Sequence, residues 1–382
     1  MTITSLEIHD GDWHLQETCF NTLNLLVGIS GVGKSRLLKA IQKICRAGIV
    51  GMDGLHEYYD YSDCSWAISF NVDGQHYRWK ANTSTNCKIP ETDNSPRGLL
   101  RSPIFLYESI ELNETLCISR NYSEGIFLFN EMPLPKLKWT ESAISILRNE
   151  PGISKIYRTI KRINASNEIN NWHSVDYGCK IPTYNTLLDI QSDVNTPLII
   201  KFFCMRDKFV DHFNEIKYDF VNIFPFVEDI AVKKTISFKN KHNIHDGYYF
   251  IAIKEINTDK WISGKDISTG MLRTLKIILE LFLAPKGSVF LIDEFENSLG
   301  VNCLPQVAEA VRTRQGEIQF FLTSHLPYVI NNIPWNCWKV VTRQGSNVTI
   351  RNAQQIPELQ TASSMDRFFL LLNSESYREG IQ

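Results

Sequence analysis

The sequence predicts an α/β fold with a mixed central sheet, flanking helices, antiparallel strands at the N-terminus and a helical insertion. Residues 1–27 alternate apolar and polar side chains in short runs and end in "LNLLV", a pattern typical of strands. Leu37, Leu38, Ile41 and Ile44 then recur at the spacing of a helix with one buried face. Further along, "SVFLID" and "IQFFLTS" are short apolar runs suited to strands that are buried on both faces of a sheet.

The remaining elements follow in chain order. "SWAISFNVDGQHYRWKA" indicates a hairpin with "DG" at its turn, and the polar stretch from Asn82 to Pro96 indicates a surface loop. "ESAISILRNEPGISKIYRTIKRI" and "LIIKFFCMRDKFVDHFNEI" have helical character, whereas "VEDIAVKKTISF" and "GYYFIAIKEI" return to strand character. Helices are expected at 266–280, at 301–314, directly after His325 and in the tail segment "MDRFFLLLNSESY".

These elements divide the chain into four expected segments. They are an N-terminal lobe with the antiparallel strands at 1–149, a helical insertion at 150–225, a C-terminal lobe at 226–343 and a C-terminal strand and helix at 344–382. A chain of 382 residues with 43% hydrophobic content is long enough for one large domain with insertions or for two domains.

Composition bears on nucleic-acid binding, on disulfide formation and on membrane insertion. A net charge of −2 gives no whole-molecule argument for nucleic-acid or membrane binding, although it does not exclude a local basic groove. The nine cysteines contain no CxxC pair and indicate free thiols in a reducing compartment. The longest apolar stretch is interrupted by Glu280, Pro285 and Lys286 and cannot span a bilayer. We therefore expect a cytoplasmic protein without membrane contact.

"GISGVGKS" carries the strongest chemical signal. It fits the pattern GxxxxGK[ST], follows an apolar strand and opens a helix, which favours a phosphate-binding loop over a plain glycine turn. In such a loop backbone N–H groups surround the phosphates, Lys34 reaches the β- and γ-phosphates, and Ser35 binds Mg²⁺. The loop therefore predicts a bound nucleotide with Mg²⁺. The predicted nucleotide-binding residues are Gly28, Ser30, Gly31, Val32, Gly33, Lys34, Ser35 and Arg36.

A pair of acids ends the apolar run "VFLIDEFENS". Asp293 stands at the carboxyl end of a predicted central strand, where a carboxylate can hold Mg²⁺ together with Ser35. Glu294 follows and can orient and deprotonate an attacking water. Taken alone, the pair could cap a helix; together with the phosphate-binding loop, it predicts a site that hydrolyses a nucleotide.

Histidines require separate interpretations. His325 follows the next predicted strand, and we expect it to contact the γ-phosphate, although a structural hydrogen bond is the simpler role for an isolated histidine. His242 and His245 are spaced HxxH, and we interpret them as part of a polar surface turn rather than a metal site.

The order of these motifs resembles that of the ABC-type ATPases. Between the phosphate-binding loop and the Asp-Glu pair, "ISTGM" is similar to the family's signature, with Ser268, Thr269 and Gly270 at the matching positions. The resemblance implies a P-loop NTPase fold of ABC-ATPase type, with Lys34, Glu294 and His325 as catalytic residues. It also implies a head-to-tail homodimer in which the signature of one subunit contacts the ATP of its partner. The alternative for Ser268 is a plain helix N-cap.

The family's D-loop, which crosses that dimer interface, matches Ser298 and Leu299. Its usual final aspartate is replaced by Gly300, so communication across the interface is left open.

The chain resembles the OLD-like, AAA15-type ATPases of bacterial defence systems in two regions, 1–45 and 265–335. Within the second region, the ATPase subunits of Septu-type systems are most similar to "ISTGMLRTL" and "LIDEFENSLG". OLD nucleases continue into a metal-dependent TOPRIM domain, for which the 57 residues after His325 leave no room. The resemblance therefore implies an anti-phage regulatory ATPase, a homodimer or higher homo-oligomer, whose separate HNH-type nuclease acts on nucleic acid through the complex.

Two alternatives remain open. A DNA-repair or DNA-processing ATPase would act on DNA directly, and Lys233, Lys234, Lys239 and Lys241 could line a basic groove, although a solvated face is the simpler interpretation. A scaffold protein that holds ATP structurally would bind ATP without releasing phosphate.

Overall fold

The computed structural model of this chain contains two compact units. The first comprises Met1–Ala165, Gly287–Asp293 and Glu317–Gln382, and the second Ser166–Lys286 and Glu294–Gly316. Within these units the structure describes residues 1–55, 63–85, 103–135, 138–165, 172–176, 180–237, 246–264, 266–300, 302–360, 364–374 and 377.

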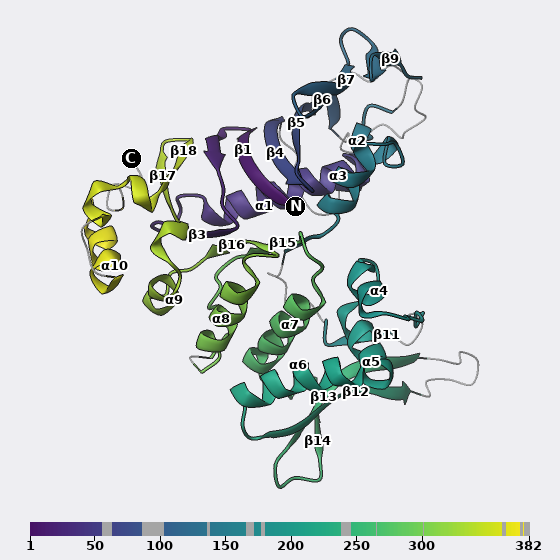
Figure 1. Cartoon of the computed structure of the whole chain (residues 1–382), viewed down its shortest axis with the longest axis vertical. Coiled ribbons are helices and arrows are strands. Elements are labelled where there is room, and N and C mark those ends of the chain that lie inside the picture. Colours follow the sequence, from purple (N-terminus) through teal and green to yellow (C-terminus); the bar gives the residue numbers. More distant parts are fainter. Residues whose placement is uncertain are drawn as a thin grey trace. The chain divides into compact units, whose positions relative to one another are not determined.

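The first unit is built on one mixed sheet (Figure 1). Among the described residues it has 14 strands in the order β10-β15-β16-β3-β17-β18-β2-β1-β4-β5-β6-β7-β8-β9. Strands β10, β15, β16, β3 and β17 pair in parallel, and the run from β2 to β9 is antiparallel. The strands are β1 (Thr2–Asp10), β2 (Trp13–Cys19), β3 (Leu23–Val27), β4 (Cys64–Val72), β5 (Gln75–Ser84), β6 (Ile104–Leu112), β7 (Thr115–Asn121), β8 (Ile126–Phe129), β9 (Met132–Pro133), β10 (Ile163–Ala165), β15 (Val289–Ile292), β16 (Gln319–Thr323), β17 (Trp338–Gln344) and β18 (Asn347–Asn352).

The parallel and antiparallel strands of this sheet differ in how deeply their residues are buried. Every residue of β3, β15 and β16 is buried, as the continuous apolar runs predict for central parallel strands. Strands β1 and β4 instead mix buried and partly exposed positions. The predicted mixed sheet with flanking helices is confirmed, and the antiparallel strands extend the same sheet.

Helices of the first unit cover this core. α1 packs against α2, α3 and the parallel strands β10 and β16, and its Leu37, Leu38, Ile41 and Ile44 are all buried in the main hydrophobic cluster. The helices are α1 (Lys34–Val50), α2 (Ala143–Ile146), α3 (Ile153–Ile160), α9 (Pro327–Asn332) and α10 (Ser364–Asn373).

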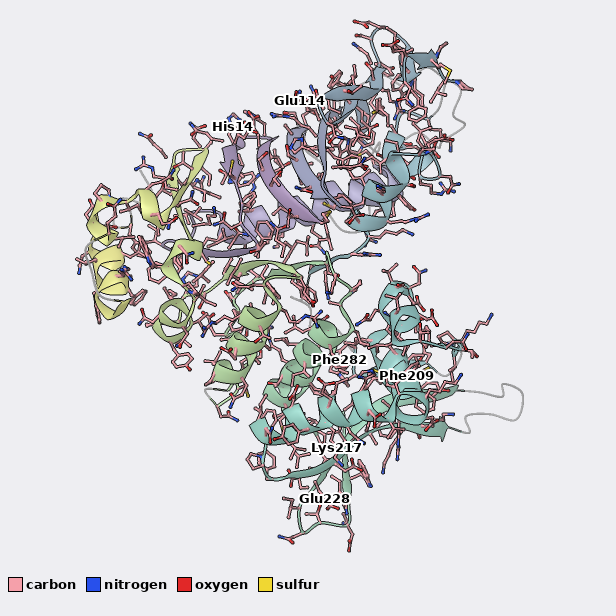
Figure 2. All side chains as sticks on the ribbon, viewed as in Figure 1. His14, Glu114, Phe209, Lys217, Glu228 and Phe282 are labelled. Carbon is pink, nitrogen blue, oxygen red and sulfur yellow. The ribbon has the colours of Figure 1, made fainter. Side chains whose placement is uncertain are left out.

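The second unit has its own core. Helices α5 and α6 pack on the antiparallel pair β12 and β13, and α7 contacts α5, α6 and α8 (Figure 1). Phe209, between α5 and α6, and Phe282, from α7, pack against the same hydrophobic cluster (Figure 2). The elements are β11 (Ser174–Asp176), α4 (Leu187–Ser192), α5 (Leu198–Lys208), α6 (Val210–Ile223), β12 (Val227–Ser237), β13 (Asp246–Glu255), β14 (Trp261–Ser263), α7 (Thr269–Leu283) and α8 (Leu304–Arg314).

Several predicted elements differ in extent from the observed ones. The hairpin with "DG" at its turn is confirmed as β4 and β5, but β5 continues through Ser84, so the start of the predicted loop is strand. The rest of that loop, after residue 85, lies outside the described residues. The long helical stretch after residue 140 is two helices, α2 and α3, because Pro151-Gly152 interrupts it. None of the described helices is long and apolar enough to cross a membrane.

A buried ion pair joins the antiparallel strands to the segment that leads into α2. Glu108 on β6 is fully buried and accepts hydrogen bonds from Trp79 Nε1 at 3.2 Å, Ser142 Oγ at 2.8 Å and Ala143 N at 2.9 Å. Arg120 Nη1 lies 3.5 Å from Glu108 Oε2. Burial raises the pKa of Glu108, whereas Arg120 lowers it. Since each charge offsets the cost of burying the other, loss of one partner should strongly lower the free energy of unfolding.

We expect Glu108→Ala to lower the free energy of unfolding by about 3–5 kcal/mol, because Arg120 is left as an uncompensated buried cation. The matched control is Glu111→Ala on the same strand, whose partner Lys80 lies at 3.0 Å in a partly exposed pair. That substitution should cost less than about 1 kcal/mol. Urea unfolding of the two variants measures the difference, and equal losses would show that burial of the pair is immaterial.

Candidate functional site

The loop between β3 and α1 has the backbone of a phosphate cradle. Gly31 and Gly33 have φ angles of 89° and 105°, a region that side chains with a Cβ atom rarely adopt. A Cβ atom at Gly28 would lie 2.5 Å from the Val341 carbonyl oxygen, so this position has no room for a side chain. The glycines of "GISGVGKS" are therefore required by the geometry of the loop itself.

The other loop residues divide between core and solvent. Val32 is fully buried in the hydrophobic cluster, whereas Ser30 and Gly31 are exposed. Lys34 is the first residue of α1, and its Nζ donates to the carbonyl oxygens of Gly28 at 2.7 Å and Ile29 at 2.9 Å. The loop thus curls around the lysine ammonium group, with Val32 anchoring it to the core.

A hydroxyl and a carboxylate meet beside this loop. Ser35 Oγ donates to Asp293 Oδ1 at 2.9 Å, although the two residues are far apart in the sequence. Thr323 Oγ1, at the end of β16, donates to the same oxygen at 2.6 Å. β15 lies next to β16, and β16 lies next to β3, all in parallel, so their carboxyl ends meet at one edge of the sheet. Oxygen ligands of this kind suit Mg²⁺, and Ser35 and Asp293 are the residues that would hold it.

Thr323 was not among the residues that the sequence predicts for this site. The available signal was a hydroxyl side chain at the last position of an apolar strand, directly before Ser324 and His325. Such residues are common, and only the pairing of β16 with β15 brings this one to Asp293. His325 lies exposed two residues beyond β16, in the same unit as the phosphate-binding loop.

Arg36 lies one residue beyond the loop and contacts β1 and β2. Its Nη2 donates to the Asp10 carbonyl oxygen at 3.0 Å, and its guanidinium lies 5.0 Å from the centre of the Trp13 ring. Asp10 also pairs with Lys43 at 3.2 Å. A Cβ atom at Gly33 would lie 3.2 Å from Trp13 Nε1, so the indole borders the loop. Asp10 and Trp13 carry no sequence signal for this placement.

Glu294 begins the second of the two segments that form the second unit, and it has an unusual backbone. Its φ angle is 46°, which is uncommon for a residue other than glycine. Its carbonyl oxygen accepts from Asn297 N at 2.7 Å, and its Oε2 accepts from Asn297 Nδ2 at 3.2 Å. The carboxylate-bearing residue is exposed, while the next residue, Phe295, is fully buried and anchors the turn.

The signature-like residues form the N-terminus of α7 in the same unit. Ser268 caps this helix, since its Oγ accepts from Met271 N at 3.2 Å. Thr269 is the first helical residue, and Ser268 and Thr269 are both exposed. An N-cap and a phosphate contact are compatible roles, because the serine hydroxyl can accept from the helix and still donate outward.

Ser298 and Leu299, the predicted D-loop residues, lie close to this helix or pack with it in the same cluster. Ser298 has a φ angle of 59°, and its carbonyl oxygen would lie 3.0 Å from a Cβ atom at Gly270. Leu299 packs against the hydrophobic cluster of the unit. Glycine at position 270 thus allows the helix start to approach the backbone of the D-loop segment.

Two lysines of the lysine-rich segment lie over aromatic rings where the segment is described, and Lys234 is exposed. Lys233 Nζ lies 3.8 Å from the centre of the Trp261 ring, and Lys234 Nζ lies 4.9 Å from that of Phe203. Lys239, Lys241, His242 and His245 lie outside the described residues. Within the described ranges, no group of three or more His, Cys, Asp or Glu side chains could hold a metal ion.

Comparisons with known proteins agree with this geometry. Residues 223–331 match a family described as "AAA domain, putative AbiEii toxin, Type IV TA system". A comparison with curated proteins gave no match. Among solved structures, the chain is similar to an SMC head bound to the C-winged helix domain of ScpA, with 13% identity, a TM-score of 0.53 and coverage of 92% of this chain and 97% of that chain.

Two further SMC heads have lower scores. One from Thermotoga maritima has 12% identity and a TM-score of 0.43, covering 92% of this chain and 99% of that chain. One derived from Pyrococcus furiosus has 13% identity and a TM-score of 0.48, covering 91% of this chain and 95% of that chain. At such identities the first likeness establishes fold alone. Together with the family match, it supports the P-loop NTPase fold of ABC-ATPase type that the sequence predicts.

Proposed function

We propose that this chain binds and hydrolyses ATP–Mg²⁺ and works as the regulatory ATPase subunit of a bacterial anti-phage defence complex. The contact of Asp293 with Ser35 carries the ATPase part of the proposal, because it joins the phosphate-binding loop to the carboxylate that such a site requires. The defence part rests on the resemblance to the Septu ATPase subunit PtuA. The matched family, whose description names a putative toxin, is in keeping with it.

Each residue has a distinct task in this proposal. Lys34 exchanges its contacts with two loop carbonyl oxygens for phosphate oxygens, which form stronger charge-assisted hydrogen bonds. Ser35 and Asp293 hold Mg²⁺, which when bound neutralises charge on the phosphates. Glu294 orients and deprotonates the attacking water, and His325 senses the γ-phosphate.

Dimerisation would complete the site. Ser268, Thr269 and Gly270 at the start of α7 would contact the ATP of a partner subunit, since a helix N-terminus favours an anion. Ser298 and Leu299 would cross the same interface. Occupancy by ATP would then favour the dimer and control a separate HNH-type nuclease, a task that needs two populated states more than it needs rapid turnover.

We expect Glu294→Gln to lower kcat for ATP hydrolysis by roughly 10²- to 10⁴-fold, the usual contribution of a general base. The affinity for ATP–Mg²⁺ should stay unchanged, because the substitution leaves Lys34, Ser35 and Asp293 intact. Phosphate release and nucleotide binding measure the two effects. Glu309→Gln on α8, where the carboxylate pairs with Arg312 at the surface, is the matched control. Unchanged turnover in the Glu294 variant would refute its assignment as the base.

We expect Lys34→Ala to weaken ATP binding by about tenfold or more, equivalent to at least ~1.4 kcal/mol. Ser268→Arg should retain binding but stop hydrolysis. A head-to-tail dimer has a sharper consequence: mixing the two inactive variants creates one intact composite site in each mixed dimer. Random pairing should then restore about a quarter of the wild-type rate.

Exposed Lys39 on α1 provides the control, since Lys39→Ala should leave binding and hydrolysis unchanged. Failure of the mixture to regain activity, with both variants folded, would rule out a site shared between subunits. Because loss of the N-cap costs about 1 kcal/mol, thermal unfolding of the Ser268 variant should first show that it is folded.

The defence assignment is tested by affinity purification of the chain from its native host, with and without ATP. We expect a stoichiometric small nuclease whose retention changes with nucleotide. Recovery of the chain alone with bound DNA, together with DNA-stimulated hydrolysis, would favour a DNA-processing ATPase. Recovery of stably bound ATP with no phosphate release would favour a scaffold.

A further inference from the structure

Arg273 is a buried cation on the inner side of the signature-like helix. It lies on α7, five residues beyond Ser268, and is 3% exposed. Burial lowers the pKa of its guanidinium, while Glu280, Glu294 and Glu296 raise it. Glu280 already pairs with Lys276 at 2.8 Å, so the helix holds its own cation for that carboxylate. The burial of Arg273 must therefore be explained by its contacts other than Glu280.

Its guanidinium reaches the backbone of the proposed base. Arg273 Nη2 donates to the Glu294 carbonyl oxygen at 3.3 Å, and its Nε has no hydrogen-bond partner in the described part of the chain. The same carbonyl oxygen also accepts from Asn297 N. Two donors therefore converge on the carbonyl oxygen of the residue whose φ angle is 46°. A non-glycine residue keeps such a conformation only when its surroundings hold it there.

A second contact joins the same two segments. Gly270 lies against the Ser298 carbonyl oxygen, so closely that an added Cβ atom would be 3.0 Å from it. The turns that follow Glu294 are hydrogen-bonded in series, with Leu299 N donating to the Glu296 carbonyl oxygen at 3.0 Å. The start of α7 thus contacts residues 294–300 at both ends of that segment.

We propose that Arg273 is a positioning residue that holds Glu294 in its left-handed conformation and so couples the signature-like helix to the proposed base. This inference rests on the proposed function, since Glu294 acts as a base only if the chain hydrolyses ATP. A shift of α7 on contact with a partner's nucleotide would be transmitted through one guanidinium group to the Glu294 backbone. Arg273 itself touches neither the nucleotide nor the water.

The test is a double-mutant cycle between Arg273→Met and Glu294→Gln. Arg273→Met should lower kcat by about 10- to 100-fold, which is part of the loss expected when the base is removed. KM and the affinity for ATP should change less than twofold. In the Glu294→Gln background the same substitution should cause no further loss, because residues that act as one unit are non-additive. Arg273→Lys should recover part of the rate, since it keeps the charge but not the planar donor group.

Amide exchange in residues 294–300 gives a readout independent of activity. It should rise in Arg273→Met and stay unchanged in Arg312→Met, a variant of an exposed arginine on the same unit. Additive losses in the cycle, or unchanged exchange at 294–300, would overturn the proposal. If Glu294→Gln leaves hydrolysis intact while exchange still rises in Arg273→Met, the assignment of the base fails and the structural coupling stands. Arg273→Lys serves the exchange measurement if the methionine variant does not fold.

Discussion

The candidate ATP site depends on the adjacency of three parallel strands. β3, β16 and β15 lie side by side, and each is buried along its whole length. Parallel strands end at the same edge of a sheet, so the start of α1, Asp293 and Thr323 are brought together by the strands and not by local sequence. The bonds of Ser35 and Thr323 to one oxygen of Asp293 are the result.

Much of this framework could be predicted from the sequence. A continuous apolar run followed by a glycine-rich loop and an amphipathic helix specifies a buried strand, a cradle and a covering helix in that order. The position of Asp293 followed from the same logic. Thr323 did not, because a threonine at the end of an apolar strand has many roles until its neighbour strand is known. The fully buried pair of Glu108 and Arg120 was equally hidden, since β6 and β7, on which the two residues lie opposite each other, were not among the predicted strands.

Backbone conformation was the other feature beyond the reach of sequence patterns. A glycine can indicate a left-handed backbone conformation, as at Gly31 and Gly33. Glu294 and Ser298 adopt this conformation without any such indication in the sequence. The Glu294 carbonyl oxygen accepts a hydrogen bond from Arg273, and the Ser298 carbonyl oxygen lies close to Gly270. From their positions in the sequence, Ser268 and Gly270 are expected to contact a partner's nucleotide, with a helix N-cap as the alternative for Ser268. Ser268 does cap α7, and Gly270 allows close packing that the sequence did not predict; both contacts bear on how rigidly the helix start is held.

Hydrogen bonding around the phosphate-binding loop suggests how ATP–Mg²⁺ binding would proceed in the proposed function. Lys34 Nζ already occupies the centre of the loop, held by two carbonyl oxygens, so the backbone is formed before a phosphate arrives. Binding then replaces neutral acceptors with charged ones, which strengthens each bond without rebuilding the loop. Ser35 faces a larger change, because a hydroxyl that donates to Asp293 would have to turn its lone pair toward the metal. Thr323 can keep its bond to Asp293 throughout, and it would hold that carboxylate in place while Ser35 exchanges its partner.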